Sequence, residues 1–341
     1  MEQRKGPMDQ LSAHLDRGWD LAQRGDALGA ESCARRALEI DADSPEVHNL
    51  LGFSAAMNGE LEDAIEHYKH AIALDESYFE AMLNAAEILI SPMGEYQEAL
   101  TMIGDALDYA ETDEETTDCL LFQIDALVGL NKKDEAKKLL ERLPKGPFAN
   151  PNYPFLIGRS HYELENFTEA WEHIEEAVKR DPESADALYY KGLLLDDRGD
   201  RRGATDCFLR SRMIDAVRPP PPWSPKPEDF AAIVKTVLAK LEPTLATMVS
   251  EAEVFVVDLP GAELVVDGVD PRSIVILDRA PTEPDGVDRL RIFVYQRSIE
   301  LAAGGRERME AELMSAFERE IANVFADRQP TAPQEKERLL N

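Results

Sequence analysis

The stretch PEVHNLLGFSAAMNGELEDAIEHYKHAIALDES, residues 45–77, decides the fold, because it consists of two amphipathic segments that meet at Gly59. Small residues stand at Gly52 in the first segment and at Ala64 and Ala71 in the second. Two antiparallel helices can cross closely only where the side chains are small, and a glycine between them permits the positive φ of a tight turn. The stretch therefore predicts a helical hairpin.

The same pattern recurs along the first two thirds of the chain at intervals of 34 to 37 residues. The central alanines of the copies are Ala30, Ala64, Ala99, Ala136, Ala170 and Ala204. The positions before and after them are occupied by Gly18, Gly52, Ala86, Ile124, Gly158 and Gly192, and by Ala37, Ala71, Ala106, Leu143, Ala177 and Ser211. The turn is occupied by Gly25, Gly59, Gly94, Asn131, Glu165 and Gly199, of which Glu165 breaks the rule.

These units resemble tetratricopeptide repeats, which have a period of 34 residues and a helix-turn-helix unit. The resemblance implies an α-helical solenoid over 11–218, after an N-terminal extension at 1–10. Its six units are expected at 11–44, 45–78, 79–113, 117–150, 151–184 and 185–218.

Composition limits the function classes. The formal net charge of −30 disfavours binding to nucleic-acid phosphates or to an anionic membrane surface, since both would be repelled. The sequence has no apolar run of spanning length, and the first thirty residues lack the apolar core of a signal peptide. Cys33, Cys119 and Cys207 are too widely separated to suggest a disulfide framework. We therefore expect a cytoplasmic protein.

Residues 219–227 read PPPPWSPKP and interrupt the helical pattern. A proline-rich stretch of this kind favours an extended, semi-rigid linker. An alternative interpretation is a ligand for a domain that recognises proline-rich segments.

Residues 228–327 change in periodicity and indicate a small α+β domain, followed by a disordered tail at 328–341. An apolar stripe predicts a helix from Phe230 to Leu241, and a second one predicts a closing helix from about Arg306 to Ala326. Between them, short runs predict strands at Val254–Val257, Leu264–Val266, Ile274–Leu277 and Leu290–Tyr295.

This domain resembles a family of minimal zincin-like bacterial proteins, in which a strand precedes a helix that ends in a His-Glu-x-x-His motif. In the family the two histidines hold Zn²⁺ and the glutamate polarises a water. On the matching positions of this sequence, Arg319 and Asn323 replace the two histidines, and only Glu320 remains. A guanidinium cannot ligate zinc, so the resemblance implies a catalytically inactive domain, a pseudoenzyme, with no metal and no cofactor.

The six histidines, His14, His48, His67, His70, His161 and His173, all belong to the repeats, and the pair His67 and His70 is interpreted as surface residues of a helix. Two alternatives remain open. The protein could be a zinc metallopeptidase that obtains its ligands from another chain, or a regulator of a related active peptidase.

Tetratricopeptide arrays bind protein segments on the side formed by the first helix of each hairpin. The family pattern implies a partner groove lined by Trp19, Asn49, Phe53, Met57, Leu83, Glu87, Ile90, Leu121, Asp125, Phe155, Arg159, Tyr162, Tyr189, Leu193, Asp196 and Asp197. Such an acidic and aromatic lining suits a basic amphipathic segment. The acidic residues could equally serve only to keep the array soluble. The sequence as a whole predicts a bacterial scaffold for protein–protein interactions.

Overall fold

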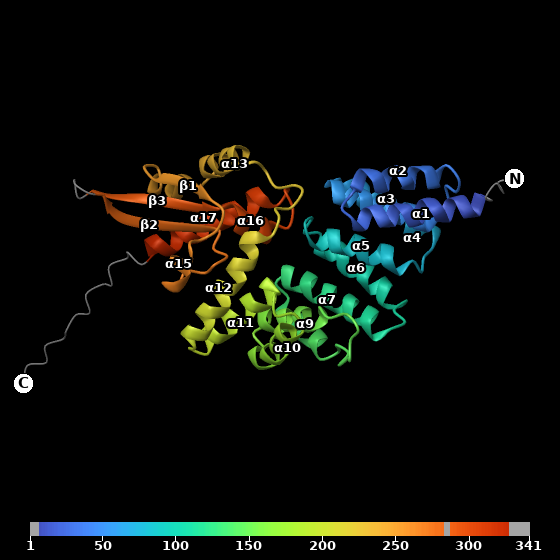
Figure 1. The fold of residues 1–341 in the computed structure, drawn as a ribbon, viewed down its shortest axis with the longest axis horizontal. Coiled ribbons are helices and arrows are strands. Elements are labelled where there is room, and N and C mark those ends of the chain that lie inside the picture. Colours follow the sequence, from blue (N-terminus) through green and yellow to red (C-terminus); the bar gives the residue numbers. More distant parts are fainter. Residues whose placement is uncertain (1–6, 283–286, 327–341) are drawn as a thin grey trace, which may run out of the picture. The chain divides into compact units, whose positions relative to one another are not determined.

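The computed structural model describes residues 7–282 and 287–326 (Figure 1). The predicted tail at 328–341 and most of the predicted extension at 1–10 lie outside these residues. By its internal contacts the chain divides into two compact units, Met1–Cys207 and Phe208–Asn341. We refer to them as the N-terminal and the C-terminal unit.

The N-terminal unit is a succession of helical hairpins, as the repeat pattern predicts. Its helices are α1 (Pro7–Gln23), α2 (Ala27–Leu38), α3 (Pro45–Asn58), α4 (Leu61–Leu74), α5 (Phe79–Ile90), α6 (Tyr96–Leu107), α7 (Asp113–Gly129), α8 (Lys133–Leu140), α9 (Tyr153–Glu163), α10 (Phe167–Arg180) and α11 (Ala185–Asp197). The next helix, α12 (Arg201–Val217), crosses the division between the units.

The turns between paired helices have the backbone conformation that the sequence predicts. Positive φ occurs at Gly25, Gly59, Gly94 and Gly199, with values between 74° and 80°. The two turns without glycine reach the same region, at 59° for Asn131 and 67° for Glu165. A bulky residue rarely adopts this conformation, so the hairpin geometry imposes it on Glu165.

Small residues bring the paired helices into contact. The central alanines of the six copies are at most 2% exposed. A Cβ atom placed on Gly52 would lie 2.7 Å from both Cδ1 and Cε1 of Tyr68, whose side chain is 1% exposed. On Gly158 it would lie 2.9 Å from Cδ1 of Ile174. At Gly52 and Gly158 the residue is therefore small because the facing helix leaves no room.

The first helices of the hairpins form one layer. Helices α1, α3, α5, α7, α9 and α11 each contact the next member of this series, whereas α2, α4, α6 and α10 pack between successive first helices. Repeats that stack in this way present the first helices along one side of the array. We call the solvent-facing side of this layer, formed by the first helices, the inner surface.

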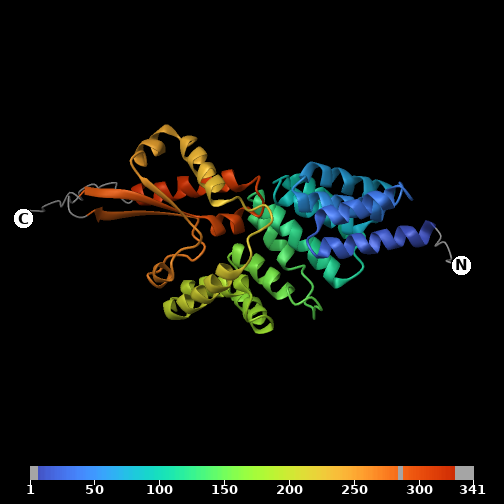
Figure 2. The same ribbon diagram turned by 45° about the horizontal axis from the view of Figure 1, so that its top comes forward.

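The C-terminal unit is a three-stranded sheet packed against helices (Figure 2). Its elements are α13 (Pro227–Ala239), α14 (Pro243–Met248), β1 (Glu253–Val257), α15 (Ala262–Val266), β2 (Val275–Thr282), β3 (Val287–Tyr295), α16 (Gln296–Ala303) and α17 (Met309–Ala326). The strand order is β1-β3-β2, with β1 parallel and β2 antiparallel to β3. Ile292 and Val294 of β3 are fully buried in one core with Phe230 of α13 and Phe317 of α17.

One prediction for this unit is wrong. The run Leu264–Val266, predicted as a strand, lies in the short helix α15, where Asp267 N donates to Glu263 O at 3.0 Å and only Val265 is buried. The closing helix α17 agrees with its prediction to within three residues at its start, whereas α14 and α16 were not predicted from the sequence. The strand propensity of β-branched residues depends strongly on their surroundings. Tertiary packing can therefore hold such residues in a single helical turn.

The proline-rich stretch is not a bare spacer. Ser224 N donates to Pro221 O at 2.9 Å, which closes a turn, and Trp223 packs against the core of the C-terminal unit. Nε2 of Gln296 donates to Pro225 O at 2.8 Å, and Pro225 is buried. The second half of the predicted linker therefore packs onto the core of the C-terminal unit.

The close helix contact at Gly52 generates a prediction. Replacing Gly52 with Ala should lower the free energy of unfolding by about 1–3 kcal/mol, because the new methyl group meets a buried ring that cannot move away. The control is Gly104→Ala in α6, where a Cβ atom would have nothing within 4 Å. There the higher helix propensity of alanine should stabilise by about 0.5–1 kcal/mol. Urea unfolding measures both variants, and equal effects would contradict the packing argument.

Candidate functional site

The predicted binding residues concentrate where three successive first helices present charged and aromatic side chains. Helix α7 contributes Asp125, α9 contributes Phe155, Arg159 and Tyr162, and α11 contributes Tyr189. All five side chains are partly exposed, so a partner could reach them.

A charged cluster joins these helices. Nη2 of Arg159 donates to Oδ2 of Asp125 at 2.7 Å, and Nε of Arg159 lies 3.6 Å from Oε1 of Glu163. The hydroxyl of Tyr190 donates to Oε1 of Glu163 at 3.1 Å. Burial raises the pKa of Asp125 and also that of Glu163, while the positive charge of Arg159 opposes both shifts. Two carboxylates share one guanidinium, so the cluster carries excess negative charge.

Aromatic rings surround this cluster, with Tyr190 at their centre. The ring centroid of Tyr190 lies 5.7 Å from that of Phe155, 5.4 Å from that of Tyr162 and 5.8 Å from that of Tyr189. All three contacts are edge-on, a favoured arrangement for aromatic pairs. Sequence reasoning missed Tyr190 and Glu163. The spacing of Arg159 and Glu163, four residues apart in one helix, is the signal that could have identified the ion pair.

Side-chain amides and aromatic rings also join the first helices of the earlier repeats. Nδ2 of Asn84 donates to Oδ1 of Asn49 at 3.0 Å, and Nδ2 of Asn49 donates to the hydroxyl of Tyr78 at 3.2 Å. The rings of Trp19 and Phe53 lie 5.4 Å apart. Helices α3 and α5 are thus joined by side-chain amides.

Three predicted groove residues are buried instead of lining a surface. Asn49, Ile90 and Leu121 are 3%, 9% and 5% exposed. These positions turn toward neighbouring helices, because each first helix is covered on several sides in the array. Of the remaining predicted residues, Trp19, Phe53, Met57, Leu83 and Leu193 are partly buried, whereas Glu87, Asp196 and Asp197 are exposed.

Two pairs of histidines in the repeats have stacked rings. The rings of His48 and His70 lie 4.0 Å apart at an interplanar angle of 13°, and those of His161 and His173 lie 5.6 Å apart at 10°. Burial lowers the pKa of His48, His161 and His173. Within 7–282 and 287–326, no group of three or more histidine, cysteine, aspartate or glutamate side chains could hold a metal ion.

The three motif residues of the C-terminal unit do not converge on a common site. Arg319 and Asn323 are exposed on α17. Glu320 is partly buried, and its Oε1 accepts a hydrogen bond from Leu277 N of β2 at 3.4 Å. Of the nearby arginines, Arg291 pairs with Asp278, and Arg297 donates to backbone carbonyls. Among the helices of the described residues, none has both the length and the apolar character needed to cross a membrane.

The charged cluster yields a second prediction. Arg159→Met leaves Asp125 and Glu163 close together without their cation, so the free energy of unfolding at pH 7 should fall by about 1–3 kcal/mol. Without Arg159 the folded-state pKa values of both carboxyls rise further. In the variant, the folded state then binds protons more readily than the unfolded chain. The loss of unfolding free energy relative to the wild-type chain should therefore shrink as the pH falls from 7 toward 4.

The matched control for this variant is Arg180→Met. Arg180 forms an exposed pair with Glu176 at 2.9 Å within α10, and its loss should cost less than about 0.5 kcal/mol. Urea unfolding at several pH values measures both variants. A deficit of Arg159→Met that grows in acid would contradict the charge argument.

Comparison with known proteins bears on the repeats. Residues 45–78 and 155–204 each match a family described as tetratricopeptide repeat. Among solved structures, the chain is similar to PilF from Pseudomonas aeruginosa, with a TM-score of 0.53 and 21% identity over 63% of this chain and 96% of PilF. It is also similar to PilW, described as a widely conserved type IV pilus biogenesis factor, with a TM-score of 0.51 and 14% identity over 61% of this chain and 94% of PilW. No curated protein matches the chain. The chain thus contains tetratricopeptide repeats, with matching segments at 45–78 and 155–204.

Proposed function

We propose that this protein is a non-enzymatic scaffold that holds a protein partner on the inner surface of its repeats. One observation carries the proposal: three successive first helices place partly exposed rings beside two carboxylates that share a single arginine. Aromatic anchors beside charged groups are the usual energetic centres of protein interfaces. Proteins with tetratricopeptide repeats generally use this layer to bind peptides or partner helices.

The partner that fits this surface is a basic amphipathic segment. Asp125 and Glu163 exceed Arg159 in charge, and the exposed Asp196 and Asp197 add to the excess. A lysine or arginine placed over Tyr162 or Phe155 would gain about 0.5–2 kcal/mol from each cation–π contact. The net charge of −30 would speed the encounter with a cationic partner.

We further propose that the C-terminal unit is a degenerate zincin-like domain without catalytic activity. The replacement of both motif histidines by Arg319 and Asn323, together with the exposure of both side chains, supports this reading. We also place the protein in the cytoplasm of a bacterium. The buried thiols Cys33, Cys119 and Cys207 fit a reducing compartment.

The partner surface is tested by affinity purification of the full chain carrying Phe155→Ala and Tyr189→Ala together. Loss of both rings should release a specific protein that the wild-type chain retains, with a loss of affinity of about tenfold or more. The control is Leu28→Ala with Tyr109→Ala, two exposed residues outside the first helices.

Salt dependence separates charge recognition from simple solubility. If the excess carboxylates recognise a basic segment, the affinity of the retained partner should fall as ionic strength rises, because the charges are screened. An affinity that does not change with salt would contradict the basic segment. If the double variant retains as much of the partner as the control does, the proposed location of the binding surface is contradicted.

Metal analysis tests the pseudoenzyme proposal. The purified full chain should retain no stoichiometric zinc after dialysis, since a cationic guanidinium at Arg319 repels a divalent ion. The Arg319→His and Asn323→His double variant is the positive comparison, because it restores the two imidazoles of the motif. Stoichiometric zinc in the unaltered chain, or peptide hydrolysis that is lost in Glu320→Gln, would overturn the proposal.

A further inference from the structure

The C-terminal unit contains a cavity of about 380 Å³, which the proposed partner surface does not use. This volume lies at the lower end of the ~300–1,000 Å³ that is typical of small-molecule sites. The apolar part of its wall consists of the proline run 219–221, Trp223 and Leu301. The charged part includes Arg218 and Glu300. A small ligand would therefore meet an apolar surface and both signs of charge.

Glu300 is a buried carboxylate with neutral donors. Its side chain is 5% exposed, and its Oε1 accepts hydrogen bonds from Oγ of Ser224 at 2.6 Å and from Nε2 of Gln296 at 2.9 Å. Both donors are uncharged, and a buried carboxylate costs free energy unless a cation or further donors compensate it. A carboxylate has about four acceptor sites, so it can accept a ligand ammonium in addition to these two donors.

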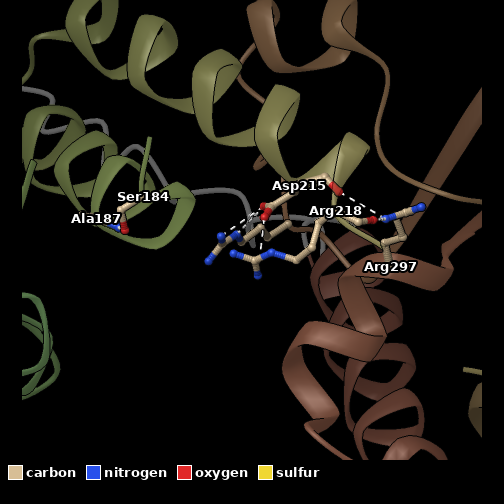
Figure 3. A network of polar contacts seen from close by, with 6 residues as sticks. Ser184, Ala187, Asp215, Arg218 and Arg297 are labelled. Atoms are coloured by element: carbon tan, nitrogen blue, oxygen red, sulfur yellow. Dashed lines mark hydrogen bonds and ion pairs between the residues drawn. The ribbon is translucent and has the colours of Figure 1, made fainter. Parts of the chain in front are cut away.

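The positive side of the cavity is built at the end of α12. Arg297 of α16 donates through Nη1 to the carbonyl oxygens of Asp215 and Arg218, so its charge is used to cap this helix (Figure 3). The carboxylate of Asp215 accepts from Nε of Arg272 at 3.1 Å and lies 4.0 Å from Nη1 of Arg218. The side chain of Arg218 is 43% exposed. Its guanidinium has five donors and can bind an incoming carboxylate beside its present contacts.

The two charged groups belong to one wall region. Glu300 follows Arg297 by three residues on α16, which places both on the same face of that helix. Arg297 in turn contacts the backbone of Arg218. The helix contact thus brings a buried carboxylate and a partly exposed guanidinium to the same cavity, next to the ring of Trp223.

We propose that this cavity binds a small zwitterion of the α-amino-acid class with an apolar side chain. The ligand ammonium pairs with Glu300, the ligand carboxylate pairs with Arg218, and the side chain lies against Trp223 and the proline run. A ligand with one charge forms only one of these two ion pairs, so the site discriminates against it. This inference does not depend on the scaffold proposal, because it involves residues of the C-terminal unit alone.

Titration calorimetry of the full chain with three related probes tests the site. The probes are L-leucine, L-leucinamide, which lacks the carboxylate, and N-acetyl-L-leucine, which lacks the ammonium. The titrations are run at about pH 6.5, below the ordinary pKa of an α-amino group. Leucine should bind about tenfold or more tightly than either analogue, since each analogue loses one charged hydrogen bond.

Two variants assign the charges. Glu300→Gln keeps the shape of the side chain and an oxygen that accepts from Ser224. It should weaken the binding of leucine by about tenfold and leave the affinity for N-acetyl-leucine unchanged. Arg218→Met keeps the backbone carbonyl that Arg297 contacts. It should weaken the binding of leucine and leave the affinity for leucinamide unchanged. Glu318→Gln and Arg319→Met, exposed on α17, are the matched controls.

The outcomes are separable. Circular dichroism and thermal unfolding show whether each variant is folded. If a variant is not folded, the binding of the three probes to the unaltered chain tests the proposal by itself. Absence of leucine binding, or equal binding of leucine and its two analogues, would overturn the proposal. Loss of binding in the control variants would do the same.

Discussion

The repeat array depends on close contact between paired helices, and in several hairpins that contact requires small side chains at fixed positions. Gly52 and Gly158 face Tyr68 and Ile174 at distances that leave no room for a methyl group. When each hairpin closes in this way, its first helix can pack on the first helix of the next repeat. The layer that results brings Asp125, Arg159 and Tyr190, which come from three separate hairpins, into one cluster.

The sequence predicted those features that each repeat determines locally. The period located the hairpins, and the turn positions predicted positive φ, which even Glu165 adopts. Contacts between repeats were not predictable in the same way. Asn49 and Leu121 are buried because neighbouring helices cover them. Tyr190 of α11 lies at the centre of the aromatic cluster because its ring contacts Phe155 and Tyr162 of the preceding repeat. In the C-terminal unit, the valines of α15 favour a strand by their intrinsic propensity, yet the segment forms a helical turn that buries only Val265.

The two units carry different chemistry. The inner surface of the repeats combines rings with an excess of carboxylates, and the proposal of a cationic partner segment rests on this combination. The C-terminal unit buries Glu300 beside a cavity, and its sequence contains no histidine. Of the three positions on α17 that resemble the zincin motif, only position 320 has the residue of that motif, and the Glu320 side chain accepts a hydrogen bond from the backbone of β2.

Photo-crosslinking in living cells tests the central claim, that the first helices hold the partner, most directly. A benzoylphenylalanine at position 189, in α11, should form a covalent adduct with a protein partner, because Tyr189 is partly exposed on the inner surface. The same group at position 168, where the exposed Thr168 lies on the second helix α10, should form none. Adducts from position 168 in the absence of adducts from position 189 would contradict the account.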